Sequence, residues 1–382
     1  MYARLIGIGA AGNKAAITAV QTGVIDKENV LLINSTLKDI PSDYDGNKYC
    51  FNNSYGGCGK ERNISRNYML SDLQNGDLDL SKFLKIGQPD QAELVVLVSS
   101  TEGGTGSGSV PILAKYILEV YGISVRCFSF IGFSDDSRGL RNTVEYFKEL
   151  EDSMAVESVS NLKYLDLVDG DKIKAEKLAN QDFCLKLSII LGNLIRDSNH
   201  NIDPTDHLKI VKTPNYSVVE YKEFTKIKNK KEFRELIKEM IDSSKSIDLD
   251  NPTQRRVGII INIDESNTSV IDTDLLEEYY GTPFEKFQHI QHEDSMPQFV
   301  AFISTGINMP VKEIEEIFNE YTERSNKIKS NTKESFFTKA NAFVFNDDEQ
   351  FNLQRSSTKT ANEFFKNLGA NKTAAPSIDE NY

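Results

Sequence analysis

A glycine-rich segment directly behind an apolar run is the feature that most constrains how this chain can fold. Residues 94–98 form the apolar run, and residues 99–109 follow with four glycines among small hydroxyl side chains. Glycine lets the backbone come close to an anion, and amide groups at a helix N-terminus bind phosphate without needing a lysine. The segment therefore predicts a phosphate-binding loop between a buried strand and a helix.

Strand-like runs recur through the first third of the chain and alternate with glycine-bearing turns and helical stretches. The runs cover residues 5–8, 30–33, 94–98 and 125–131. Repetition of strand, loop and helix is typical of a parallel sheet with helices on its faces. Ligands bind at the carboxyl ends of such strands, so we expect the glycine-bearing loops to form one site.

Composition and charge exclude several classes of protein. The 382 residues are 39% apolar and 26% charged, which suits two globular domains of ordinary size. Apolar runs stay shorter than the roughly 20 residues that span a membrane, and the N-terminus does not resemble a signal peptide. We therefore expect a cytoplasmic protein that does not bind membranes. A net charge of −13 argues against direct binding of nucleic acid.

The cysteine and histidine residues of this sequence do not predict a metal site. Four cysteines are scattered through the sequence without a Cys-x-x-Cys pair, which indicates neither a zinc site nor a disulfide framework. Two histidines and two acids lie within residues 289–294. Because nothing else in the sequence converges on this segment, we interpret it as a solvated loop or helix end rather than as a metal site.

Residues 7–12 have the spacing Gly-x-Gly-x-x-Gly, which alone favours the Rossmann unit of a nicotinamide-dependent oxidoreductase. That unit needs an acidic residue for the ribose at the end of the second strand, where this chain has Asn34. A Walker A loop is excluded because Lys14 is followed by alanine rather than serine or threonine. The oxidoreductase stays open as an alternative of a different class, although it leaves the glycines of residues 103–108 without a role.

The run Gly-Gly-Thr-Gly-Ser-Gly at residues 103–108 resembles the signature of the tubulin and FtsZ superfamily. Residues 201–206 match the FtsZ pattern Asn-x-Asp-x-x-Asp. The form Gly-Gly-x-Gly-Lys at residues 56–60 looks like the TubZ branch, the plasmid and phage partition tubulins that include one from a clostridial phage. The resemblance covers the chain to about residue 345. It implies a GTPase that binds GTP or GDP with Mg²⁺ and is activated by self-assembly.

The resemblance assigns nucleotide contacts to the loops that follow the predicted strands. The first loop, at residues 9–13, surrounds the diphosphate, and the second, at residues 34–36, lies near the sugar and phosphates. The third loop, at residues 55–62, lies near the terminal phosphate, where Lys60 adds charge unless it is a solvated loop lysine. Asp182 would accept from the guanine ring, although it could equally be an acid favoured at a helix start. The predicted nucleotide-binding residues are Gly9, Ala10, Ala11, Gly12, Asn13, Asn34, Gly57, Gly59, Lys60, Gly103, Gly104, Thr105, Gly106, Ser107, Gly108, the ribose-binding Asp135 and Arg138, and Asp182.

The segment that matches the FtsZ pattern contains the predicted catalytic residues. In the family this loop completes the active site of the neighbouring subunit, so that hydrolysis requires assembly. The resemblance makes Asp203 and Asp206 the catalytic pair that orients the attacking water, with Asn201 as a neighbour in contact with the nucleotide. Without the resemblance, Asn-x-Asp-Pro would be a turn followed by a helix cap.

We expect a tubulin-like α/β fold in which a long central helix joins two unequal parts. The helix is predicted from a wide apolar stripe over residues 175–197. The predicted organisation is a Rossmann-like GTP-binding domain at 1–174, the central helix at 175–200, the catalytic loop and a smaller activation domain at 201–309, C-terminal helices at 310–369 and a disordered tail at 370–382.

The resemblance also implies two partners. One is a second copy of the chain, stacked head to tail in a filament. The other is a DNA-binding adaptor of the TubR type, which we expect to bind the C-terminal region from residue 358 onward. An FtsZ-type cell-division protein stays open as an alternative, although residues 375–382 do not resemble the terminal peptide that binds membrane anchors in that family.

Overall fold

The computed structural model describes residues 1–52, 56–150, 154–198, 202–244 and 252–333. The predicted catalytic neighbour Asn201 and the predicted C-terminal segments beyond residue 333 lie outside the described residues. Within the described ranges, no helix is both long enough and apolar enough to cross a membrane.

The strands of the described residues form one ten-stranded sheet in the order β3-β2-β1-β4-β5-β6-β7-β10-β8-β9. Neighbouring strands from β3 to β6 in this order are parallel, whereas β10 runs antiparallel to both β7 and β8. The strands are β1 (Ala3–Ile8), β2 (Val30–Asn34), β3 (Asn47–Cys50), β4 (Leu94–Ser100), β5 (Ser124–Ile131), β6 (Ala155–Ser160), β7 (Asn215–Glu223), β8 (Arg256–Asn262), β9 (Glu285–Gln291) and β10 (Phe299–Ile307).

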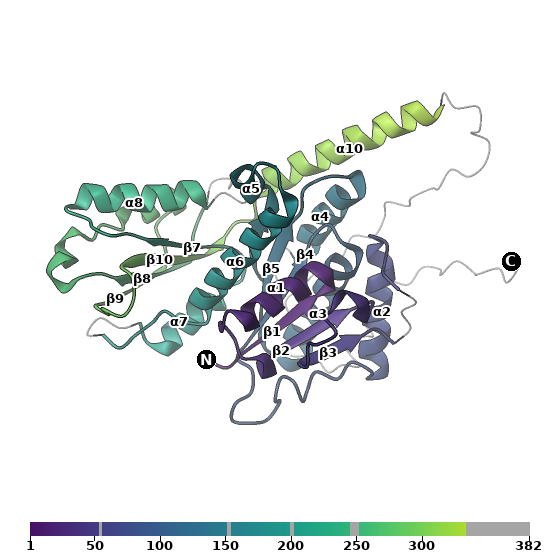
Figure 1. Ribbon diagram of the computed structural model, residues 1–382, viewed down its shortest axis with the longest axis horizontal. Helices are drawn as coiled ribbons and strands as arrows, with labels where there is room; N and C mark the ends of the chain where they lie inside the picture. The colour runs from purple at the N-terminus through teal and green to yellow at the C-terminus, as the bar shows by residue number, and fades with distance from the viewer. Residues whose placement is uncertain (53–55, 151–153, 199–201, 245–251, 334–382) are drawn as a thin grey trace, which may run out of the picture.

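Helices cover both faces of this sheet, as Figure 1 shows. One buried apolar cluster packs α2, α3, α4, α8, α9 and α10 against one face, and a second packs α1, α5, α6 and α7 against the other. The helices are α1 (Gly9–Gln21), α2 (Arg62–Asn75), α3 (Gly104–Tyr121), α4 (Ser137–Leu150), α5 (Asn161–Leu165), α6 (Lys172–Ile190), α7 (Pro204–Val211), α8 (Lys230–Ser243), α9 (Asp274–Tyr280) and α10 (Val311–Lys333).

The central helix α6 begins earlier and ends earlier than the sequence pattern predicts. The Asp171 carboxylate caps its first turn by accepting from the amides of Ile173 and Lys174 at 3.1 Å each. The helix ends at Ile190 because Gly192 adopts a left-handed conformation, with φ of +76°, which terminates helices readily. The apolar residues beyond the helix, Leu191, Leu194 and Ile195, are partly buried and pack against the second apolar cluster from non-helical backbone.

Strand β9 lies where the sequence analysis places a solvated loop or helix end, and that prediction is wrong. His289 is fully buried in β9, with its Nε2 atom 2.9 Å from Oε1 of Gln291. The backbone amide of Ile202 donates to Nδ1 of His289 at 3.3 Å. Polar side chains that bond to one another inside the fold conceal this strand from an analysis based on apolar periodicity.

A buried cluster of charges joins β6 to β7, where only two residue pairs connect the two halves of the sheet. Beyond these pairs, Nζ of Lys186 lies 3.0 Å from Glu157 on β6 and 3.3 Å from Glu220 on β7. The Glu157 carboxylate also accepts from the amide of Val219 at 3.2 Å, and Arg126 binds the carbonyl of Val211 at 3.0 Å. Ionic contacts thus take the place of sheet hydrogen bonds at this joint.

Candidate functional site: two half-sites at opposite ends of the fold

The glycine-rich loop after β4 packs so tightly that three of its four glycines, Gly104, Gly106 and Gly108, cannot be replaced without displacing neighbouring atoms. A Cβ atom on Gly104 would lie 2.8 Å from the amide nitrogen of Glu61, in the loop before α2. A Cβ on Gly106 would lie 2.8 Å from Cβ of Ser99 and 3.0 Å from the carbonyl oxygen of Ile8. Real Cβ atoms essentially never come this close to other atoms, so these positions require glycine.

The first loop, between β1 and α1, lies against the same segment. Gly9 has a φ of +75°, and a Cβ atom there would lie 3.1 Å from the amide nitrogen of Gly106. A Cβ on Gly12 would lie 2.1 Å from the carbonyl oxygen of Val98. The predicted residues Gly9, Ala10, Ala11, Gly12 and Asn13 all belong to the first turns of α1. The structure therefore brings the first loop and the glycine-rich loop together.

The N-termini of α1 and α3 meet here without the capping side chains that usually accept hydrogen bonds from the first amides of a helix. Among the described residues, no side chain caps α1 at Ile8 or α3 at Gly103, and neither helix has an acid in its first turn. The first amides of a helix have no partner within the helix, and the helix dipole adds positive potential there. Two such N-termini side by side form a strong binding place for an anion.

The second loop contributes polar side chains that are largely occupied within the protein. Asn34 is buried, and its Oδ1 atom accepts from the amide of Ser35 at 2.9 Å. The hydroxyl of Ser35 lies 3.0 Å from that of Thr105, which connects this loop to α3. Asn13 donates to the carbonyl of Ile33 at 3.3 Å, while its buried Oδ1 atom accepts no hydrogen bond from any described residue. That unused acceptor lies in the predicted nucleotide-binding loop.

Ion pairs tie the third loop to the loop and helix that follow β5. The side chain of Lys60 pairs with Asp136, and Nη1 of Arg138 lies 2.7 Å from the carboxylate of Glu61. Asp135 pairs instead with Lys172, at the start of α6, at 2.7 Å. The predicted residues Lys60, Asp135 and Arg138 thus lie along one edge, and each is paired with another protein side chain. The adjacent Gly57 and Gly59 have no neighbouring atom within 4 Å of a built Cβ.

Glu102 is a residue of this site that the sequence analysis did not single out. Its carboxylate accepts from the amide of Ser134 at 2.9 Å, and a Cβ atom on Gly132 would lie 2.1 Å from it. Burial raises the pKa of Glu102 above its ordinary value. The side-chain amide of Asn142 donates to the carbonyls of both Glu102 and Lys60, at 2.9 and 3.0 Å. Glu102 therefore connects the glycine-rich loop to the loop after β5, and its only signal in the sequence is its place beside Gly103.

Asp182 lies in the interior of α6, which excludes the interpretation that it is an acid at a helix start. The helix begins ten residues earlier, at Lys172, and the helix dipole acts only within the first turn. The Asp182 side chain is 20% exposed and lies 3.7 Å from Nζ of the buried Lys186. Burial, followed by the charge of Asp182, raises the pKa of the neighbouring Tyr164. One face of Asp182 is thus bound in the charge cluster while part of the carboxylate is accessible.

The predicted catalytic carboxylates lie at the N-terminus of α7. Asp203 is exposed and caps the helix by accepting from the amide of Thr205 at 2.7 Å, a bond that lowers the pKa of Asp203. Asp206 lies in the first turn and pairs with Lys209 at 2.8 Å. The local structure of this segment is a turn followed by a helix cap, which is also what the sequence predicts for it without a functional role.

The positions of the two groups in the fold separate them widely. The glycine loops follow the carboxyl ends of β1 and β4, whereas α7 precedes β7, whose Asn215 pairs with Ala155 at the beginning of the parallel strand β6. Figure 1 shows α6 running between α5 and α7, and Nε2 of His207 on α7 lies 2.9 Å from the carbonyl of Ile190 at the end of α6. At about 1.5 Å per residue, the 19 residues of α6 span about 28 Å. The carboxylates of α7 therefore cannot reach the glycine loops of their own chain.

Comparison with known proteins identifies this architecture. No protein-family model and no curated protein matches the sequence. Among solved structures, the GTPγS-form protofilament of Bacillus thuringiensis serovar israelensis TubZ matches with a TM-score of 0.70 at 16% identity, covering 87% of this chain and 94% of that one. The chain has a tubulin-like fold.

Two further structures support the same fold. Clostridium botulinum phage c-st TubZ matches with a TM-score of 0.66 at 16% identity, covering 86% of this chain and 98% of that chain. The GTPγS-bound protofilament of CetZ2 from Haloferax volcanii matches with a TM-score of 0.68 at 17% identity, covering 86% of this chain and all of the other, 100%. The tubulin-like fold that the resemblance implies is confirmed.

Proposed function

We propose that this protein binds GTP at the glycine loops and assembles head to tail, so that α7 of one copy completes the site of the next. The observation that carries this proposal is the separation of the two half-sites. One end has uncapped helix N-termini suited to phosphates, and the other has exposed carboxylates that cannot reach them. Two structures of similar fold are GTPγS forms of protofilaments.

Phosphates fit the glycine-loop end better than any other ligand class. The amides at the starts of α1 and α3 bind the α- and β-phosphates. Lys60 exchanges Asp136 for the terminal phosphate. Mg²⁺ would be held mainly by phosphate oxygens and water, as is usual for this ion. A nicotinamide site would use the loop at residues 7–12 alone and would leave its close contact with Gly106 unexplained.

The base is selected by Asp182. A carboxylate accepts from both the ring N–H and the amino group of guanine, whereas adenine presents the opposite arrangement at those positions. Nζ of the buried Lys186 lies 3.7 Å from the Asp182 carboxylate and holds it in place. Because the side chain is partly exposed, a bound base has access to it. This assignment predicts that guanine nucleotides bind more tightly than adenine nucleotides.

Hydrolysis takes place at the contact between copies. Asp203 and Asp206 of one copy orient the attacking water toward the terminal phosphate bound to the next, and Asn201 contacts that nucleotide. Phosphoryl transfer requires mainly positioning and charge compensation, which such a junction provides. The lowered pKa of Asp203 keeps this carboxylate charged at neutral pH. A contact between unlike ends does not close on itself, so repeated copies form a filament.

The cellular role that fits these features is the segregation of plasmid or phage DNA in the cytoplasm. A net charge of −13 disfavours direct DNA contact, so a basic DNA-bound adaptor of the TubR type would bind the C-terminal region. Removal of residues 358–382 should then abolish co-sedimentation of filaments with an adaptor–DNA complex while GTP hydrolysis continues. Undiminished co-sedimentation would reject this role for the segment.

The test of the proposed function is GTP hydrolysis measured against protein concentration in the presence of Mg²⁺. We expect a rate per chain that rises above a threshold concentration, together with sedimentable filaments. In Asp203→Asn/Asp206→Asn, hydrolysis should be lost while GTP binding remains, and asparagine preserves the helix cap at position 203. A rate per chain that does not vary with concentration would mean that each copy hydrolyses alone, and the proposal would fail.

A further inference from the structure

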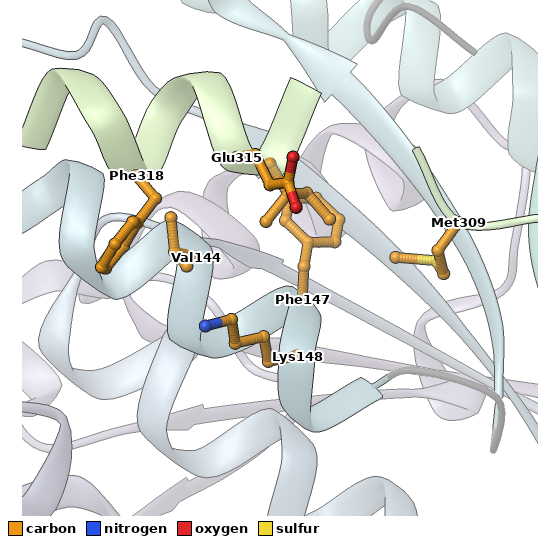
Figure 2. Close-up of a pocket in the computed structure, with 7 residues that line it drawn as sticks. Val144, Phe147, Lys148, Met309, Glu315 and Phe318 are labelled. Carbon is orange, nitrogen blue, oxygen red and sulfur yellow. The ribbon is translucent and has the colours of Figure 1, made fainter. Parts of the chain in front are cut away.

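The C-terminal helix α10 packs on α4 with a cavity between them. Figure 2 shows Phe318 and Glu315 of α10 on one side of this cavity and Lys148 and Phe147 of α4 on the other. The cavity has a volume of about 280 Å³, and Nζ of Lys148 lies 5.3 Å from the centre of the Phe318 ring. An interface with a void of this size lacks close packing, so specific polar contacts gain importance in fixing the position of α10.

One such contact reaches the edge of the nucleotide half-site. Nη1 of Arg324 donates to the carbonyl oxygen of Ser134 at 2.7 Å. Ser134 has a φ of +56°, a left-handed conformation that is unfavourable for a residue other than glycine. Arg324 also pairs with Glu320 along the exposed surface of α10. The guanidinium therefore contacts both its own helix and a strained residue in the loop before α4.

Ser134 begins a tripeptide in which every residue contacts a different part of the site. Its amide donates to Glu102 of the glycine-rich loop at 2.9 Å. Asp135 pairs with Lys172 at the start of α6, and Asp136 pairs with Lys60 of the third loop. A change in the backbone of Ser134 would redirect both aspartates, because the direction of the following chain depends on its dihedral angles.

We propose that Arg324 is a positioning residue for the third loop: it stabilises the left-handed conformation of Ser134 and so keeps Asp136 on Lys60. The position of α10 is thereby coupled to the availability of Lys60. This coupling is reciprocal, so a ligand that draws Lys60 away from Asp136 weakens the contact of α10 with the body, and displacement of α10 releases Lys60. The part that concerns the terminal phosphate rests on the proposed function.

Hydrogen exchange of the nucleotide-free protein tests the structural step directly. Arg324→Gln should accelerate amide exchange at residues 59–61 and in the first turn of α4. Glu320→Gln is the matched control, because it removes the other partner of Arg324 and leaves the contact with Ser134 intact. Unchanged exchange at residues 59–61 in Arg324→Gln would overturn the proposal.

A double-mutant cycle identifies the route of the effect. Glycine adopts a φ of +56° without strain, so Ser134→Gly should remove the need for Arg324. In the Ser134→Gly background, Arg324→Gln should no longer accelerate exchange at residues 59–61. An equal acceleration in both backgrounds would mean that Arg324 acts by a route other than Ser134, and the proposal would be wrong.

The nucleotide step is tested by the affinities for GTPγS and GDP. Because Lys60 is freed from Asp136, Arg324→Gln should raise the ratio of GTPγS to GDP affinity by about fivefold, at the lower end of usual couplings between sites. Glu320→Gln should leave the ratio unchanged. An unchanged ratio in Arg324→Gln would overturn the coupling to the phosphate. If the unaltered protein binds neither nucleotide, the proposed function fails, while the exchange experiments still decide the role of Arg324.

Discussion

The two ends of this molecule are built in opposite ways. At the glycine-loop end, three chain segments lie against one another so closely that Gly104 and Gly106 have no room for a methyl group. There, backbone amides of α1 and α3 and the paired Lys60 provide positive potential. At the other end, the short helix α7 presents Asp203 on the surface, with Asp206 beside it.

Under the proposed function, this difference indicates which parts of a phosphoryl-transfer site each end would supply. Precise loops with uncapped amides bind and neutralise phosphates, but the glycine-rich loop has only Glu102 as an acid, and that residue is committed to Ser134. The α7 end has carboxylates without a phosphate cradle. Because their charges are complementary, the two ends are suited to meet between copies rather than within one.

The largest effect is expected from changes at the α7 end. Asp203→Asn/Asp206→Asn should lower the hydrolysis rate by about 10²- to 10⁴-fold, the usual range for groups that assist proton transfer and water positioning. GTP affinity should stay the same, because the glycine loops are untouched. Hydrolysis and equilibrium binding of a fluorescent GTP analogue measure the two quantities. Lys209→Gln, which removes only the partner of Asp206, serves as the control and should retain activity. Equal loss of binding and hydrolysis would remove the distinction between the two ends.

A change at the glycine-loop end should have the reverse profile. Gly104→Ala places a Cβ atom 2.8 Å from the amide of Glu61, so we expect about tenfold weaker nucleotide binding and a loss of about 1–3 kcal/mol of stability. Gly57→Ala is the matched control for stability and should unfold like the unaltered protein, since nothing lies within 4 Å of its built Cβ. Titration calorimetry and thermal unfolding compare the two variants. Similar behaviour of both would show that close packing at this end does not determine binding.

The proposed selection of guanine by Asp182 also tests the comparison of the two ends, because Asp182 belongs to α6, the helix that lies between them. Asp182→Asn should reduce the preference for GDP over ADP by about 1–3 kcal/mol, because an amide no longer accepts from both guanine donors. Competition binding with both diphosphates gives this preference. Glu176→Gln, on the same helix and paired only at the surface with Lys14, should leave it unchanged. A preference that survives Asp182→Asn would place the base elsewhere.

The smallest effect concerns the joint between the ends. Burial raises the pKa of Glu157 from 4.5 to about 7, although Lys186 and Arg126 partly oppose this. The folded chain therefore holds this proton more tightly than the unfolded chain, so the contribution of Glu157 to stability declines as the pH rises from about 4.5 to about 7. The slope is at most about 1.4 kcal/mol per pH unit.

Glu157→Gln should remove this part of the pH dependence of unfolding measured with denaturant. The contribution of the buried His207 is present in both proteins and cancels in the difference, whereas Glu220 shares Lys186 with Glu157, so its contribution is measured separately in Glu220→Gln. Glu239→Gln, at an exposed pair with Lys222, should retain the original slope. If Glu157→Gln and the unaltered protein have parallel pH profiles, Glu157 does not titrate in this window.

The sequence predicts the glycine-loop half of the molecule better than the rest. Strands β1, β2, β4 and β5 are mainly apolar runs, and the glycine spacing identifies the loops that follow β1 and β4. Strands β6, β7 and β9 remain hidden because Glu157, Glu220 and His289 are polar residues that are buried by pairing across the fold. The periodicity of apolar residues does not reveal which polar residues will find a buried partner.

The candidate site shows the same limit. The spacing in the sequence singles out Lys60 and Asp203, yet it misses Asp136 and Glu102, whose roles arise from contacts with elements far away in the sequence. The end of α6 at Ile190 is another example, because a left-handed Gly192 overrides an apolar pattern that continues. Site residues that belong to a local sequence motif can therefore be predicted. Site residues whose role depends on distant contact partners can be identified only from the structure.

Mixing two inactive variants tests the central claim most directly. At a GTP concentration too low to fill its weakened site, Gly104→Ala should be inactive although it keeps its carboxylates, and Asp203→Asn/Asp206→Asn should bind GTP but lack the carboxylates. At equal amounts, the mixture should regain roughly a quarter of the unaltered activity, because random assortment creates roughly one complete junction in four. A mixture no faster than the sum of the separate variants would contradict a site divided between two copies.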